Sequence, residues 1–129
     1  MRANLLIIDD DEHLGVVLRR ALRGYDITVV TSAEEGLAQV EERSFDGILC
    51  DVTLPGTSGI DFYTRVARLR PGQERNVRFI TGGATEIATE TFLEAHEGEV
   101  LHKPFEVSDL RDFVAKLVDS PAAHAHHAH

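Results

Sequence analysis

Tryptophan is absent from this sequence of 129 residues, and cysteine occurs once, as Cys50. A single cysteine excludes an internal disulfide bond, which agrees with a reducing compartment. No apolar run approaches the roughly 20 residues that a membrane-spanning helix needs, and the chain does not open with the charged and then apolar pattern of a signal peptide. We therefore expect a cytoplasmic protein that makes no use of a membrane.

Basic residues are also few. Lys and Arg together number 13 against 22 Asp and Glu, so the formal net charge is −9. The basic residues are scattered along the chain, and a nucleic-acid-binding face normally needs them grouped. We therefore expect no direct contact with nucleic acid. The length fits one compact domain, and the hydrophobic fraction of 43% is enough for an ordinary core.

Apolar strand-like runs alternate with stretches of helical periodicity along the whole chain. The expected strands cover residues 5–8, 27–30, 45–50, 77–80 and 100–101. The expected helices follow them at residues 14–22, 33–40, 58–69, 85–95 and 107–118. Strict alternation predicts an α/β fold, a doubly wound five-stranded parallel sheet with helices on both faces. The helix at 85–95 has the weakest pattern, with Ile87, Phe92 and Ala95 expected on its inner face.

The last residues differ in composition from the rest. Residues 122–129 are alanine and histidine only. Such a tail is consistent with a weak transition-metal site, or with a disordered terminus left by an expression vector. We assign residues 1–120 to the domain and leave residues 121–129 out of it as a disordered, vector-derived tail.

Polar residues follow four of the five expected strands at their carboxyl ends, where ligands bind in open α/β sheets. They are Asp9, Asp10 and Asp11 after the first strand, Asp51 after the third, Thr81 after the fourth and Lys103 after the fifth. Each signal is weak alone: an acidic residue such as Asp11 often only caps the next helix, and Asp51, Thr81 and Lys103 could be turn or surface residues. Together, at matching strand ends, they predict a site.

The chemistry of that site follows from its residue types. Clustered carboxylates repel one another unless a cation lies between them, and hard oxygen ligands suit Mg²⁺. A carboxylate can also act as a nucleophile toward phosphorus. Phosphoryl transfer needs alignment and neutralisation of the phosphoryl oxygens, which Mg²⁺, the Lys103 ammonium and the Thr81 hydroxyl would supply.

These motifs resemble a known family. The segments Leu-Leu-Ile-Ile-Asp9-Asp10-Asp11, Asp51-Val-Thr-Leu-Pro-Gly, Ile-Thr81-Gly and Lys103-Pro-Phe are similar to those of response-regulator receiver domains of two-component systems, over residues 4 to about 119. The resemblance implies that Asp51 is the phosphoacceptor and that the sheet order is 2-1-3-4-5. It also implies that the peptide bond from Lys103 to Pro104 is cis.

The resemblance further implies a metal site and a set of partners. Asp10, Asp51 and the backbone carbonyl of Thr53 would bind Mg²⁺ directly, Asp9 would act mainly through water, and Lys103 would pair with the phosphoryl group. The donor would be a sensor histidine kinase or a histidine phosphotransfer protein in a phosphorelay, and the chain would be a signalling domain rather than a true enzyme. Phosphorylation would switch the face of the fourth helix, fifth strand and fifth helix for partner binding. A homodimer is also common in the family.

One position departs from the family pattern. Receivers commonly carry Tyr or Phe three residues before the lysine, where this chain has Val100. A pure docking module that no longer uses its phosphate is therefore an alternative. A phosphohydrolase is another, but such enzymes typically carry an aspartate two residues after the nucleophile, where Thr53 stands here. The Thr81-Gly-Gly stretch and the Lys-Pro-Phe ending resemble receivers attached to hybrid histidine kinases.

Overall fold

A computed structural model describes residues 2–54, 56–82, 87–96 and 98–119. The strands are β1 (Asn4–Ile8), β2 (Asp26–Val30), β3 (Gly47–Asp51), β4 (Val77–Thr81) and β5 (Val100–His102). The helices are α1 (Glu12–Ala21), α2 (Ala33–Glu42), α3 (Gly59–Leu69), α4 (Ile87–Ala95) and α5 (Val107–Val118). The predicted alternation is confirmed, and the tail at 121–129 lies outside the described residues.

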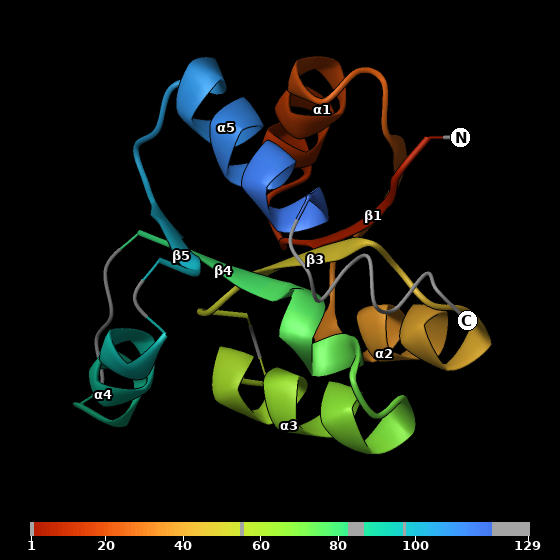
Figure 1. Cartoon of the computed structure of the whole chain (residues 1–129). Coiled ribbons are helices and arrows are strands. Elements are labelled where there is room, and N and C mark those ends of the chain that lie inside the picture. The colour runs from red at the N-terminus through yellow and green to blue at the C-terminus, as the bar shows by residue number, and fades with distance from the viewer. Residues whose placement is uncertain (1, 55, 83–86, 97, 120–129) are drawn as a thin grey trace.

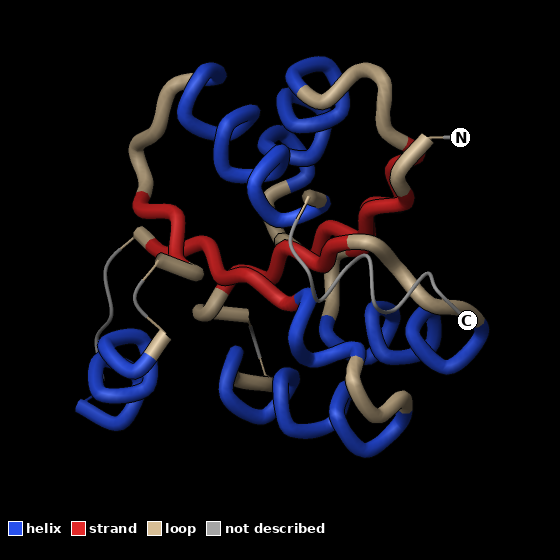
Figure 2. The backbone as a smooth tube through the Cα atoms, in the orientation of Figure 1, coloured by secondary structure: helices blue, strands red, loops and turns tan. Residues whose placement is uncertain are grey.

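All five strands lie in one parallel sheet in the order β2-β1-β3-β4-β5, as predicted. Figure 1 shows α1 and α5 on one face of this sheet and α2, α3 and α4 on the other. Figure 2, in the same orientation, shows the strands as one layer between the two layers of helices. Because every strand runs in the same direction, all five carboxyl ends meet at one edge of the sheet.

Two hydrophobic clusters fill the space on either side of the sheet. Alternate residues of each central strand point to opposite faces, so Leu6 and Ile8 join one cluster while Leu5 and Ile7 join the other. The first cluster packs under α2 and α3 and includes Phe62 and Phe79, and the second packs under α1 and α5. Strands β1 and β3 are buried on both faces, which explains why both read as continuous apolar runs.

Three helices begin at side chains that accept backbone N–H groups of the first turn. Asp11 caps α1 by accepting from the amides of His13 (3.0 Å) and Leu14 (3.2 Å). Ser32 caps α2, and Ser58 caps α3. The cap at Ser58 sets the residue at which α3 begins. It therefore sets the length of the loop between Asp51, at the end of β3, and that helix.

The structure differs from the predicted elements in detail. Residues Gln73–Asn76 form a 3₁₀ helix before β4, which the sequence pattern did not predict. The side chain of Gln73 is buried and bonds the backbone of Phe45 in both directions, at 2.8 and 2.9 Å. The inner face predicted for α4 was partly wrong: Phe92 packs on the core, but Ala95 is exposed. The predicted start at Thr85 and the side chain of Ile87 lie outside what the structure describes, so the inner-face prediction for Ile87 stays a prediction.

No helix in the described ranges is long and apolar enough to cross a bilayer. The single cysteine, Cys50, is fully buried on β3 as a small core residue. Burial, together with the neighbouring charge of Asp51, raises the pKa of the Cys50 thiol well above its usual range. A buried thiol that stays protonated is a poor nucleophile and a poor metal ligand, so Cys50 is a structural residue.

Candidate functional site

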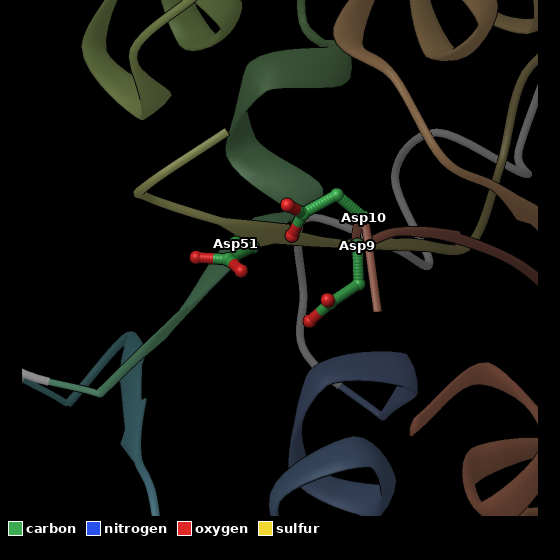
Figure 3. Close-up of side chains that lie close together, drawn as sticks. All are labelled: Asp9, Asp10 and Asp51. Atoms are coloured by element: carbon green, nitrogen blue, oxygen red, sulfur yellow. The ribbon is translucent and has the colours of Figure 1, made fainter. Parts of the chain in front are cut away.

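The acidic residues predicted to converge do so at the carboxyl edge of the sheet. Figure 3 shows the carboxylates of Asp9, Asp10 and Asp51 gathered at the ends of β1 and β3. A ligand oxygen from each of the three lies within 4.8 Å of the others. Asp9 is 1% exposed and Asp51 4% exposed, whereas Asp10 is open to solvent. Two carboxylates therefore line the floor of the site and one stands at its mouth.

Asp51 is held by the residue two positions after it. The backbone N–H and the side-chain hydroxyl of Thr53 both donate to Oδ1 of Asp51, each at 2.9 Å. The backbone N–H of Val52 donates to the carbonyl of Ile80 (3.1 Å), which prolongs the β3–β4 pairing past the acceptor. This turn orients the Asp51 carboxylate. Oδ1 accepts the two hydrogen bonds from Thr53, whereas Oδ2 faces the Lys103 ammonium.

The positioning role of the Thr53 side chain was missed in the sequence. The signal was present, because an aspartate commonly accepts a hydrogen bond from the backbone two residues on. The predicted role of Thr53 concerned its backbone carbonyl as a metal ligand, which stays a prediction.

Lys103 supplies the positive charge of the site. Its Nζ lies 3.4 Å from Oδ2 of Asp9 and 3.7 Å from Oδ2 of Asp51, so one ammonium bridges two buried carboxylates. Its backbone N–H donates to the carbonyl of Thr81 at 2.7 Å, which fastens the end of β5 to the end of β4. The peptide bond from Lys103 to Pro104 is cis, as the resemblance implied.

Thr81 stands at the end of β4, beside these groups, and is 1% exposed. Asp11 does not join the cluster of three carboxylates, because its side chain caps α1. The interpretation of Asp11 as a helix cap is therefore confirmed.

Burial raises the pKa of Asp9 above its usual value, and the nearby charge of Asp51 raises it further. The backbone N–H of Asp11 (2.9 Å) and the Lys103 ammonium act in the opposite direction, but they do not cancel the desolvation. An ionised Asp9 therefore lowers the stability of the fold in the absence of a metal ion. A divalent cation beside Asp9 would offset this unfavourable burial of negative charge.

This cost leads to a prediction about pH. Because the folded-state pKa of Asp9 is raised above 3.8, the ionised group destabilises the fold at neutral pH, and the cost disappears as the pH falls through the raised value. We expect Asp9→Asn to be more stable than the parent protein at pH 7 in EDTA, since Asn can still accept from Asp11. The difference should shrink toward pH 4, as urea midpoints at several pH values would measure. A variant less stable than the parent at pH 7 would contradict this.

The residues present fit a magnesium ion by their chemistry. Three carboxylates within reach of one another offer hard oxygen donors, and two of them are buried with only one ammonium to balance them. The exposed Asp10 leaves room on the solvent side for the waters that Mg²⁺ usually keeps.

A cluster of aromatic rings lies beyond the site, on the face of the sheet covered by α3 and α4. The Phe79 ring on β4 lies 6.1 Å from Tyr63 of α3, 5.2 Å from Phe92 of α4 and 5.8 Å from His96, measured between centroids. Val100 is the β5 partner of Phe79 and packs on the same core cluster. The sequence did not reveal this cluster, because its rings come from separate elements.

Comparison with known proteins agrees with the fold and the site. The family model described as "Response regulator receiver domain" matches residues 5–115. The DNA-binding response regulator MtrA of Mycolicibacterium paratuberculosis is 32% identical over 112 residues, which are 85% of this chain but 48% of that protein. The transcriptional regulatory protein ZraR of Salmonella typhimurium is 30% identical over 91% of this chain and 26% of its own length. The chain thus spans half or less of these relatives.

Solved structures are similar over nearly the whole chain. A putative response regulator from Chloroflexus aurantiacus has a TM-score of 0.79 and 31% identity, covering 93% of this chain and 100% of that one. The receiver domain of the sensor histidine kinase PA1611 from Pseudomonas aeruginosa, described with a magnesium ion coordinated in its active-site cleft, has a TM-score of 0.80. It is 24% identical, with coverage of 93% and 100%, so this likeness concerns the fold.

Proposed function

The chain belongs to the response regulator receiver family, and on that premise we propose that it is a phosphorelay receiver whose Asp51 takes a phosphoryl group in a reaction that depends on Mg²⁺. The observation that carries the proposal is the buried Asp51 carboxylate at the end of β3, with Asp9, Asp10 and Lys103 converging on it. The protein is a signalling module rather than a true enzyme.

The metal site would be formed by Asp10, Asp51 and the backbone carbonyl of Thr53, with Asp9 acting mainly through water. Bound Mg²⁺ would neutralise charge on the phosphoryl oxygens and align the phosphoryl group with the carboxylate. Asp10 and Asp51 would contact the ion directly, and the raised pKa of Asp9 supports a role for that carboxylate close to a positive charge.

The transfer step is a displacement at phosphorus. A carboxylate oxygen of Asp51 forms a bond to phosphorus, while the bond from phosphorus to a donor imidazole nitrogen breaks and the imidazole leaves with the electron pair. Thr53 holds Oδ1 by two hydrogen bonds, which limits rotation of the Asp51 carboxylate before the phosphorus approaches. The Lys103 ammonium moves from its carboxylate partners to the phosphoryl oxygens, and the Thr81 hydroxyl donates to one of them.

The donor would be a sensor histidine kinase or a histidine phosphotransfer protein. Its histidine must reach Asp51, so the donor must cover the rim formed by the start of α1 and the β5–α5 loop. Large apolar side chains are exposed on the two helices that begin at this rim: Val16 and Val17 on α1 and Val107 on α5 are 50%, 39% and 46% exposed. A pocket that includes Leu14, Val17 and Phe105 opens beside Lys103. These apolar surfaces support docking of a protein donor at the site.

Phosphorylation would then change the face formed by α4, β5 and α5 for partner binding. The second candidate function is a docking module whose partner binding does not depend on phosphate. It is supported by Val100, which stands where receivers commonly carry Tyr or Phe. Residues 1–120 would form the receiver unit, residues 121–129 an appended tail, and the protein would act in the cytoplasm.

Transfer from a phosphorylated donor tests this function. We expect label to pass from a phosphohistidine donor to the chain in the presence of Mg²⁺, and hydroxylamine to release it, because hydroxylamine cleaves acyl phosphates. Label that resists hydroxylamine would place the phosphoryl group on another residue type and would contradict the proposal.

A further inference from the structure

A groove between α2 and α3 lies away from the phosphoacceptor site, and the proposed function makes no use of it. Its floor is apolar: Leu37 and Ala38 line it from α2, and Leu69 lines it from α3. Leu69 is 44% exposed, which makes it one of the few large apolar side chains open to solvent among the described residues. Exposed apolar surface of this kind marks an interaction site more often than an isolated surface leucine does.

The two edges of the groove carry opposite charges. Glu34 and Glu41 stand on the α2 edge, and Arg65 and Arg68 stand on the α3 edge. Helix α2 contains four glutamates and neither Lys nor Arg. The ion pairs found among the described residues involve His96 and Lys103, so none of them joins the two edges. Both edges therefore offer charge to a partner.

We propose that this groove is an interface with a second copy of the chain, arranged about a two-fold axis that runs along the groove. The two helices run in the same direction, because each leads back from the carboxyl edge of a parallel sheet (Figure 1). An axis along the groove lays α2 of one copy against α3 of the other, twice, so that the glutamates of each copy face the arginines of its partner.

The alternative symmetric arrangement is electrostatically unfavourable. An axis across the groove would lay α2 on α2 and α3 on α3, which opposes like charges. A second copy is the occupant that supplies the complementary pattern by symmetry alone, with Leu37, Ala38 and Leu69 meeting their counterparts at the centre. The net charge of −9 opposes association, so the dimer is weak and forms at high protein concentration.

Charge reversal tests both the face and the axis. Glu34→Lys/Glu41→Lys gives a groove with two basic edges, and Arg65→Glu/Arg68→Glu gives a groove with two acidic edges. Each variant alone should dimerise at least tenfold more weakly than the parent, because like charges then face each other. An equimolar mixture of the two should recover the association, since the basic α2 edge of one meets the acidic α3 edge of the other.

Sedimentation velocity of the full chain from about 10 μM to 1 mM, in EDTA, measures the association without metal bridging by the terminal histidines. Arg23→Glu/Lys116→Glu lies outside the groove and is the control for Arg65→Glu/Arg68→Glu, because both double substitutions lower the formal net charge by the same amount. Glu34 accepts a hydrogen bond from Thr57 (3.2 Å), so thermal melts of each variant check folding.

Three results would overturn the proposal. If the parent chain stays monomeric up to 1 mM, a second copy is not the partner of the groove. A dimer that neither reversal weakens uses a different face. Reversals that weaken the dimer without recovery in the mixture exclude the two-fold arrangement. Recovery specific to the mixture, with the control variant unchanged, is the result that the proposal predicts.

Discussion

Lys103→Met should slow phosphorylation of Asp51 by about 100-fold or more, because removal of one preorganised charge that stabilises a transition state typically costs that much. Lys103 is the ammonium that bridges Asp9 and Asp51, at 3.4 and 3.7 Å from their Oδ2 atoms. Methionine keeps most of the side-chain length but offers no donor to the phosphoryl oxygens. The initial rate of phosphoryl uptake from acetyl phosphate, followed by mass, measures the effect.

A matched control tests whether the effect comes from the position of the Lys103 charge in the site or only from a change in the net charge of the protein. Lys116→Met removes the same charge from the exposed face of α5, so its rate should equal that of the parent. Lys103→Arg should restore little, because a guanidinium is a planar fork rather than the compact point charge that this site holds. If Lys103→Met takes up the phosphoryl group at a rate within threefold of the parent, Lys103 does not stabilise the transition state as proposed.

Phe79→Ala should destabilise the protein by about 3–5 kcal/mol, the usual cost of removing a buried phenylalanine ring. Phe79 is fully buried on β4, and its ring meets Tyr63, Phe92 and His96. A domain of this kind has a total stability of about 5–15 kcal/mol, so the loss is a large part of the whole. Urea unfolding at pH 7 measures it.

The same substitution should loosen α4 before the rest of the fold. Phe92 and His96 lie on or next to α4, and His96 also bonds Glu99 through Nδ1 at 2.9 Å. Amide hydrogen exchange in α4 should therefore quicken more than exchange in β1 or β3. Val16→Ala, at a side chain that is 50% exposed, should cost under about 0.5 kcal/mol and serves as the control. A cost below about 1 kcal/mol for Phe79→Ala would show that the ring cluster does not hold this face together.

The parallel sheet was predictable from the sequence because its central strands are buried on both faces. Burial on two faces requires uninterrupted apolar residues, as in Leu5 to Ile8, and such runs stand out in any linear reading. The site was predictable for a related reason. Parallel strands place their carboxyl ends together, so residues far apart in sequence, such as Asp9 and Lys103, could be expected to meet.

Features that depend on side-chain packing between elements were not predictable. The four-ring cluster is assembled from α3, β4, α4 and the segment after α4, and no periodicity links these positions. The 3₁₀ helix at Gln73–Asn76 depends on hydrogen bonds between Gln73 and the distant backbone of Phe45. Ala95 fits an apolar stripe by its spacing, yet a small side chain at the end of a short helix gains little by burial and lies exposed.

Intact mass after incubation with Mg²⁺ and acetyl phosphate tests the central claim, that Asp51 is the Mg²⁺-dependent phosphoacceptor. The parent chain should gain one phosphoryl group, and the gain should vanish with EDTA and in Asp51→Asn. A phosphoryl group on Asp51→Asn, or on the parent in EDTA, would contradict the assignment. So would a parent chain that stays unmodified by both acetyl phosphate and phosphorylated histidine donors, and the docking-module alternative would then be the better account.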